Sequence, residues 1–182
     1  KMFSLSKTQT SRLNSGLSQS NLKSLSYNLI QFSSQDPSHP IRNLTTKNNK
    51  NGWLSNRYCT YPQEIFIQFP SQILLKQINI LINESKIPKM IEFINCIPID
   101  EKNILIINNN KESWYIPSEF HYERLGFIKL SPNSENGYKA RELRKIFINI
   151  NCNYLKLKIS RNYTNKFNIF CQVGIENLQF FG

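Results

Sequence analysis

The residues of this chain that could do chemistry are mainly basic, and their spacing suits binding rather than catalysis. Residues 139–166 hold eight Lys or Arg residues and a single acidic one. Such a concentration of positive charge attracts partners of opposite charge when the side chains share one surface. We therefore predict a partner-binding surface made of Arg57, Lys139, Arg141, Arg144, Lys145, Lys156 and Lys158.

Several of these residues also have a structural interpretation. The run 139–145 fits a solvated loop in which Glu142 pairs with a neighbouring arginine, an arrangement that contributes little to stability. Arg57 suits an anionic ligand, and equally an internal ion pair with Glu64. Trp53, just after a glycine, suits either an exposed aromatic platform or a side chain that fills the core. These alternatives stay open from sequence.

No catalytic constellation is visible in the sequence. The two histidines, His39 and His121, do not accompany a recognisable nucleophile motif. The six glycines are isolated from one another, so there is no glycine-rich phosphate loop. The four cysteines lack the short spacing of a zinc site, and we expect reduced thiols. We predict that the protein is not an enzyme.

Length and charge describe a single soluble domain. A chain of 182 residues fits one domain, and no apolar run approaches the roughly 20 residues that a membrane helix needs. The net charge is +11, and residues 1–63 resemble 139–166 in carrying eight basic and one acidic side chain. These two segments generate an anion-attracting field only if they converge in space. We predict a cytoplasmic protein without a membrane span.

Apolar residues at alternate positions predict many short β-strands. The alternation is clear in residues 78–82, 146–150 and 155–159. In the last of these, the apolar residues claim the core, so Lys156 and Lys158 must face away from it. Repeated short strands separated by turns predict an all-β protein, an antiparallel β-sandwich of the jelly-roll type.

The limits of this domain and of its elements are also predicted. Residues 1–26 are serine-rich without a sustained period, which indicates a flexible extension before a domain of residues 27–182. Pro70 is expected to end the strand that begins near Ile65, since proline cannot donate to a ladder. Residues 118–125 and 139–145 could each form a helical turn or two.

Several runs carry a resemblance to a known family. The strand pattern and the run Ser33 to Leu44 (SSQDPSHPIRNL) resemble the opening of galactose-binding-like jelly rolls, the discoidin or coagulation-factor type C group. Within that group, further runs, in order over residues 29–182, resemble the N-terminal jelly-roll domain of a family of centrosomal, ciliary-tip proteins that also carry a tubulin-binding TOG domain. These runs are Gly52-Trp53, Ser55, Arg57, Cys59, Pro62-Gln63-Glu64, Arg124-Leu125-Gly126, Lys139-Ala140-Arg141-Glu142-Leu143, Asn165-Lys166-Phe167-Asn168-Ile169 and Gln172-Val173-Gly174.

The resemblance implies a non-catalytic docking domain of a microtubule-associated protein, located at the tip of a cilium or flagellum or at a centriole or basal body. The expected partner is a protein, either tubulin in a microtubule or a ciliary adaptor, and no cofactor is expected. Nucleic-acid or phosphate binding driven by net charge ranks last.

Calcium or sugar binding by some jelly rolls of this group gives the main alternative function. In that case the protein is a lectin-like domain that binds calcium or a carbohydrate, with Asp36 and Asn43 as candidate metal ligands. Thr46-Lys47 stands where the usual pattern of the group has Asp-Gly, so the ligand set departs from that pattern.

Overall fold

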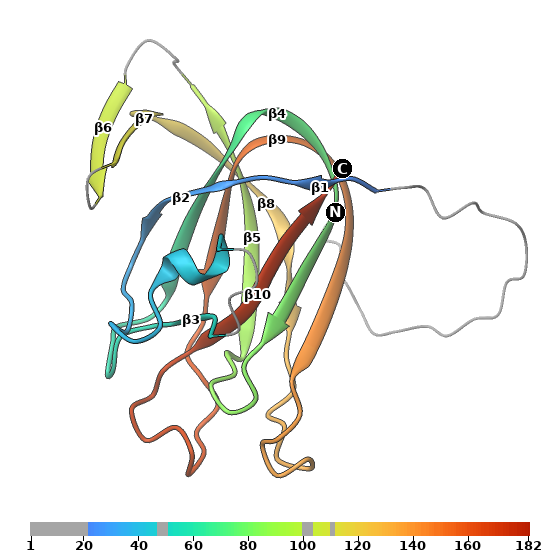
Figure 1. Ribbon diagram of the computed structural model, residues 1–182. Helices are drawn as coiled ribbons and strands as arrows, with labels where there is room; N and C mark the ends of the chain where they lie inside the picture. Colours follow the sequence, from blue (N-terminus) through green and yellow to red (C-terminus); the bar gives the residue numbers. More distant parts are fainter. Residues whose placement is uncertain (1–21, 47–50, 100–103, 110–111) are drawn as a thin grey trace, which may run out of the picture.

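The computed structural model describes residues 22–46, 51–99, 104–109 and 112–182, and its regular structure is almost entirely β (Figure 1). The strands pair antiparallel throughout, which confirms the predicted fold class. The elements are β1 (Ser24–Leu25), β2 (Asn28–Phe32), the short 3₁₀ helix η1 (Ile41–Leu44), β3 (Trp53–Leu54), β4 (Gln63–Ile82), β5 (Met90–Pro98), β6 (Ile104–Asn109), β7 (Glu112–Pro117), β8 (Phe120–Lys129), β9 (Glu142–Ile159) and β10 (Gly174–Phe181).

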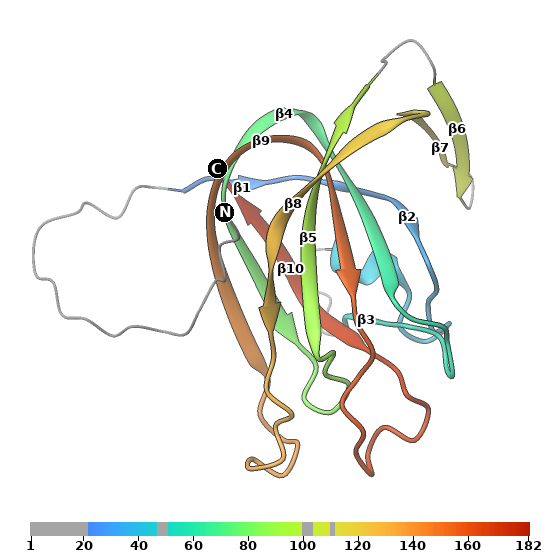
Figure 2. The ribbon, with the colours of Figure 1, turned by 180° about the vertical axis from the view of Figure 1, so that it is seen from behind.

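The sandwich has two layers because its longest strands, β4 and β9, bend and run through both (Figures 1 and 2). The first layer consists of β2, the start of β4, the end of β9, β5 and β8. The second layer consists of β1, β10, the end of β4 and the start of β9, and β3 pairs with the start of β10. Strands β6 and β7 form a separate hairpin. The two bends lie side by side at one end of the sandwich.

Pro70 lies in the bend of β4 and does not end the strand, so that prediction was wrong. The register between β4 and β9 is interrupted between Gln68 and Ile73, and Pro70 falls inside this interruption. Its missing N–H therefore removes no ladder hydrogen bond. Next to it, Phe69 packs edge-on against Phe180 of β10, with ring centroids 5.2 Å apart. The bend is thus fixed against the second layer.

The core lies between the two layers and follows the predicted alternation. In β4, the three isoleucines of residues 78–82 are fully buried. In β9, the apolar residues of 155–159 are fully buried while Lys156 and Lys158 face outward. Ile146 is buried in the other half of β9. A pleat of period two therefore decides which side chains reach the core.

Two details of the predicted elements were wrong. Residues 118–125 and 139–145 form no helix; they largely enter β8 and β9, where pairing with neighbouring strands overrides weak helical preference. Ser24 and Leu25 pair with β10, so residues inside the predicted extension belong to the sheet. The rest of that extension, residues 1–21, lies outside the described residues. No helix in the described part of the chain is long and apolar enough to cross a membrane.

Candidate binding site at the loop end of the sandwich

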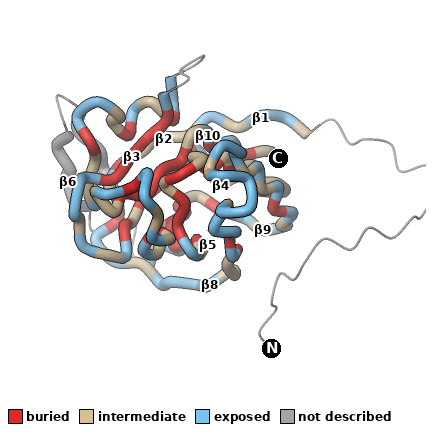
Figure 3. The backbone as a smooth tube through the Cα atoms, turned by 90° about the horizontal axis from the view of Figure 1, so that it is seen from below, coloured by how far each residue is buried: buried red, intermediate tan, exposed pale blue. Residues whose placement is uncertain are grey.

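Four loops gather at the end of the sandwich opposite the bends of β4 and β9 (Figure 1). They comprise residues 56–60, 83–89, 131–141 and 161–172, and we call their combined surface the loop face. Viewed from below, buried strands lie at the centre of the molecule and exposed segments surround them (Figure 3).

Hydrogen bonds and ring contacts hold these loops against one another. Asn133 Nδ2 donates to the Glu84 carbonyl at 2.9 Å, and the Tyr58 N–H donates to the Phe170 carbonyl at 2.9 Å. The rings of Tyr138 and Phe167 meet edge-on, with centroids 5.7 Å apart. Each of the four loops therefore contacts at least one other, and the loop face is ordered before any partner arrives.

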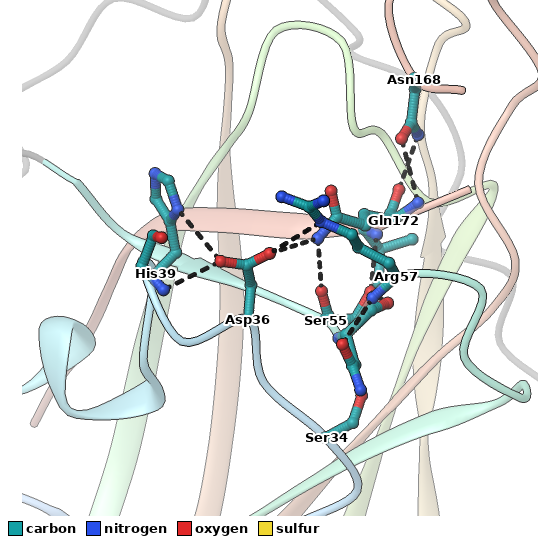
Figure 4. A network of polar contacts seen from close by, with 10 residues as sticks. Ser34, Asp36, His39, Ser55, Arg57, Asn168 and Gln172 are labelled. Carbon is teal, nitrogen blue, oxygen red and sulfur yellow. Dashed lines mark hydrogen bonds and ion pairs between the residues drawn. The ribbon is translucent and has the colours of Figure 1, made fainter. Parts of the chain in front are cut away.

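Asp36 forms the buried centre of a polar network beside this face (Figure 4). Its Oδ1 accepts the Ser38 N–H at 2.9 Å, and its Oδ2 accepts Gln172 Nε2 at 3.2 Å. The Arg57 Nε lies 3.7 Å from Oδ2, and the His39 Nδ1 lies 3.8 Å from Oδ1. Both carboxylate oxygens therefore face donors of the protein itself.

These contacts decide the charge of Asp36. Burial raises the pKa of this carboxyl, but the hydrogen bonds from Ser38 and Gln172, together with the charges of Arg57 and His39, outweigh it, and the net pKa is lowered. Asp36 is therefore an anion at neutral pH and a poor proton donor. Its role is to fix the cations around it.

Gln172 carries the network from Asp36 into the loop of residues 161–172. Its Nε2 also donates to the Ser55 carbonyl at 2.8 Å, and its N–H donates to Asn168 Oδ1 at 3.0 Å. Asn168 Nδ2 returns a hydrogen bond to the Gln172 carbonyl at 2.7 Å. Ser55 Oγ accepts the Val173 N–H at 3.0 Å. Buried amides thus fix this loop against the segment that follows β3.

Arg57 pairs with Asp36, and the predicted alternative of a pair with Glu64 was wrong. Glu64 lies on β4, where its Oε2 is 3.6 Å from Lys156 Nζ. The guanidinium carbon of Arg57 lies 4.4 Å from the centre of the Phe170 ring. A carboxylate and an aromatic face therefore set its orientation while most of the side chain stays exposed.

Trp53 fills the core, which is one of the two positions that the sequence allowed for it. Its side chain is buried, and its Nε1 donates to the Ser34 carbonyl at 3.1 Å. It therefore supports the loop face from beneath and presents no exposed aromatic platform.

A pocket of about 380 Å³ opens in the loop face. Buried Asp36 and Gln172 belong to its lining, together with three cations, Arg57, Lys86 and Lys166. A larger hollow of about 720 Å³ adjoins η1, β1 and β10, but none of the described residues that line it is charged. Because charge and convergent polar groups mark a specific site better than volume does, the smaller pocket is the candidate binding site.

The seven predicted partner-binding residues divide among different surfaces. Arg57, Lys139 and Arg141 lie on the loop face and are exposed. Arg141 is also close to Glu84, with Nε 3.4 Å from Oε2. Lys139 forms no ion pair within the described residues.

Arg144 points toward the space between the layers. It forms an ion pair with Glu142, and a pair between Glu142 and a neighbouring arginine was one of the sequence predictions. Its Nη2 also donates a hydrogen bond to the Lys129 carbonyl at 3.3 Å. That contact joins β9 to β8 across the edge of the sandwich. Arg144 therefore has a structural position.

The other three predicted residues lie on strand faces. Lys145 is exposed on β9, on the outer side of the second layer. Lys156 and Lys158 lie on the outer side of the first layer, and the Lys156 Nζ is 4.5 Å from the centre of the Tyr122 ring. The structure thus places three of the seven predicted residues on the loop face and the remaining four outside it.

The candidate calcium ligands do not fit a calcium site. Asp36 is occupied by protein donors and faces the cation Arg57. Asn43 Nδ2 donates to the Gly52 carbonyl at 2.7 Å. Calcium takes six to eight oxygen ligands, with carboxylates among them. No cluster of three or more His, Cys, Asp or Glu residues suited to a metal occurs in the described ranges.

Pocket residues that the sequence did not single out are Lys86 and Phe170. Lys166 and Phe167 belong to a polar connection with aromatic residues, Asn162 to Ile169, whose composition suits a recognition loop and equally an asparagine-rich turn. Lys86 stands alone between apolar or small neighbours, so no pattern identifies it. Its place in the pocket depends on how the loops meet.

The two-layered antiparallel sandwich is a jelly roll with the galactose-binding-like fold, as comparison with solved structures shows. A carbohydrate-binding module, CBM32-3, from a family 31 glycoside hydrolase of Clostridium perfringens has a TM-score of 0.61 and 18% identity, over 86% of this chain and 91% of that one. Reduced XRCC1, bound to the catalytic domain of DNA polymerase β, has a TM-score of 0.60 and 15% identity, over 87% and 97% of the two chains. At these identities the likeness shows the fold alone.

Sequence comparison identifies the family. Residues 52–182 match the family model described as centrosomal protein CEP104, N-terminal domain, and the chain belongs to this family. The centrosomal protein of 104 kDa from Homo sapiens is 30% identical over 132 residues, and that from Mus musculus is 28% identical over 132 residues. Each alignment covers 72% of this chain and 13% of the relative, so the chain matches a small part of those proteins. The resemblance seen in the sequence is confirmed.

Proposed function

We propose that this chain is a non-catalytic protein-interaction module of a centrosomal or ciliary microtubule-associated protein, and that it docks through the loop face. The observation that carries the proposal is the composition of this face. Its four loops hold seven basic and two acidic side chains. They also expose large apolar side chains, with Tyr58 at 69% and Ile169 at 65% exposure. Basic and aromatic side chains together favour an acidic protein surface over a neutral ligand.

Family membership supports the cellular context. The relatives are named as centrosomal proteins, which favours a cytoplasmic site at a centriole, a basal body or a ciliary tip. The acidic surface of tubulin in a microtubule suits the charge of the loop face, and an acidic ciliary adaptor suits it equally. In either case the proposed role is binding and no chemistry, because the Asp36 carboxylate is already taken up by Ser38, Gln172 and Arg57 and is not free to activate a nucleophile.

Co-sedimentation with microtubules tests this proposal, with soluble tubulin and an acidic carrier protein run beside it. The expected result is binding to microtubules at about 150 mM salt as well as at lower salt, because hydrophobic contacts persist where exposed charges are screened. Binding to the carrier protein should fade at the higher salt. If both interactions disappear together, the positive charge acts non-specifically and the proposal of a tubulin contact is wrong.

A further inference from the structure

The geometry points to an acidic peptide as the occupant of the loop-face pocket: a side-chain carboxylate of an extended segment enters between Arg57, Lys86 and Lys166. An apolar residue next to that carboxylate rests on the rim formed by Phe167 and Ile169. This inference rests on the proposed function, because it names the chemistry that the same surface recognises. It adds which residues bind and what they bind.

The cations of the pocket have unused binding capacity. Lys86 and Lys166 line the pocket, and neither forms an ion pair within the described ranges. Arg57 approaches Asp36 through Nε, at 3.7 Å, and more than half of its side chain is exposed. Its terminal amino groups donate no hydrogen bond to another described residue. A carboxylate fits this arrangement because the guanidinium fork binds two oxygens at once.

Asp36 shapes the pocket without neutralising it. Its carboxylate is buried and accepts hydrogen bonds from Ser38 and Gln172, so it holds Arg57 in place. One fixed anion faces three cations, which leaves the pocket positive. A singly charged carboxylate gains from the cations with little repulsion from Asp36.

The rim explains why the occupant is a peptide and not a free acid. Phe167 and Ile169 are 55% and 65% exposed, and both line the pocket. Between them, Asn168 is buried and fixed to Gln172 by two hydrogen bonds. The two apolar side chains are therefore held outward on an ordered loop. Preorganisation of this kind reduces the entropy lost on binding.

Fluorescence anisotropy with blocked peptides tests the inference. The probe is labelled Glu-Glu-Phe-Glu-Glu, acetylated and amidated so that its only carboxylates are side chains. The comparison peptides are Gln-Gln-Phe-Gln-Gln, which lacks charge, and Glu-Glu-Ala-Glu-Glu, which lacks the apolar residue. We expect the first comparison peptide to lose binding and the second to bind several-fold more weakly. Equal binding of all three peptides, or no binding of the probe, overturns the inference.

Variants of the domain assign the effect to residues. Lys86→Gln and Lys166→Gln should each lower the affinity for the probe by about fivefold or more. Arg57→Lys should lower it as well, because lysine keeps the charge but lacks the guanidinium fork. Lys76→Gln is the matched control, since Lys76 is exposed on β4, away from the pocket. Circular dichroism melts verify folding, and the two lysine variants keep the test valid if Arg57→Lys is unstable. Equal affinities of all variants and the control overturn the inference.

The two proposals fail in distinguishable ways. If microtubule co-sedimentation persists while the peptide variants have no effect, the loop face docks a partner without using this pocket. If peptide binding follows the predicted pattern but microtubules do not bind, the carboxylate site stands and its partner is a different acidic protein.

Discussion

Arg57 and Asp36 face each other from two separate loops, with Nε and Oδ2 3.7 Å apart, and Asp36 is buried while Arg57 is largely exposed. The pair joins the polar network under the loop face to the surface that a partner meets. The Phe170 ring, 4.4 Å from the guanidinium carbon, closes the other side of Arg57. A buried anion and an aromatic ring together hold one exposed cation in position.

The charge of Asp36 predicts how stability depends on pH. Because its pKa is lowered in the folded state, ionised Asp36 stabilises the fold above the ordinary aspartate pKa of about 3.9. This contribution is lost as the pH falls through the lowered pKa. Asp36→Asn should therefore lower the free energy of unfolding by about 1–2 kcal/mol near neutral pH, and by less as the pH drops below 4 or so. Urea denaturation across this range measures it, and a constant difference contradicts the assignment.

Two glycines with positive φ form a matched test of backbone packing near the site. A Cβ on Gly52 (φ +58°) would lie 2.5 Å from the Ile175 carbonyl oxygen, whereas a Cβ on Gly137 (φ +59°) would meet nothing within 4 Å. Gly137→Ala should cost about 1 kcal/mol from the left-handed conformation alone. Gly52→Ala should cost about 3 kcal/mol, because overlap with β10 adds to that strain. Equal costs in urea denaturation would show that β3 can move away from β10.

Much of the fold could be predicted because strand periodicity is a local property. The alternation in residues 78–82 and 155–159 identified their inward side chains correctly. Pro70 was misread because a bend and a strand end present the same residue type. The interruption in the ladder that accommodates Pro70 depends on β9, which is far away in sequence.

The site was harder to predict because it depends on how loops meet. The sequence singles out Arg57, but it marks the partner Asp36 only as a candidate metal ligand of the alternative function, because an arginine approaching a buried carboxylate leaves no local pattern. Arg144 and Lys145 are adjacent in sequence, and the pleat sends them to opposite faces of β9. A run of basic residues therefore did not form one surface.

Burial predicts that the cysteines fall into two reactivity classes. Burial raises the pKa of Cys96 and that of Cys152 to about 12, so both thiols stay protonated in the folded protein. Cys59 and Cys171 are only half-buried, and all four thiols are free. Ellman's reagent at mild alkaline pH should modify two thiols quickly in the native protein and all four in guanidinium.

A double variant controls that assignment. Cys59→Ser with Cys171→Ser should leave almost no fast reaction in the native state. Rapid modification of the double variant would mean that the core opens more readily than its packing indicates.

Calcium should leave this domain unchanged. The carboxylate of Asp36 is already occupied by donors, and Asn43 Nδ2 bonds a carbonyl, so millimolar calcium should not shift the melting temperature. Galactose should likewise cause no shift, since the pocket is lined by cations. A calcium-dependent rise that Asp36→Ala abolishes would favour the lectin-like alternative.

The central claim is that the loop face is the docking surface. Two variants with the same change in net charge, made at different ends of the sandwich, test it most directly. One variant carries Lys139→Glu and Arg141→Glu on the loop face. The other carries Lys23→Glu and Lys76→Glu, both exposed and outside the four loops. Net charge falls equally in both variants, so microtubule binding through a non-specific electrostatic field would weaken equally in both.

We predict that microtubule co-sedimentation at about 150 mM salt falls roughly tenfold for the loop-face variant and stays near the wild-type level for the other variant. Arg144 is left unchanged, because it joins β9 to β8 and its reversal would disturb the fold. Equal loss in the two variants, or loss only in the one altered away from the loops, would contradict the account.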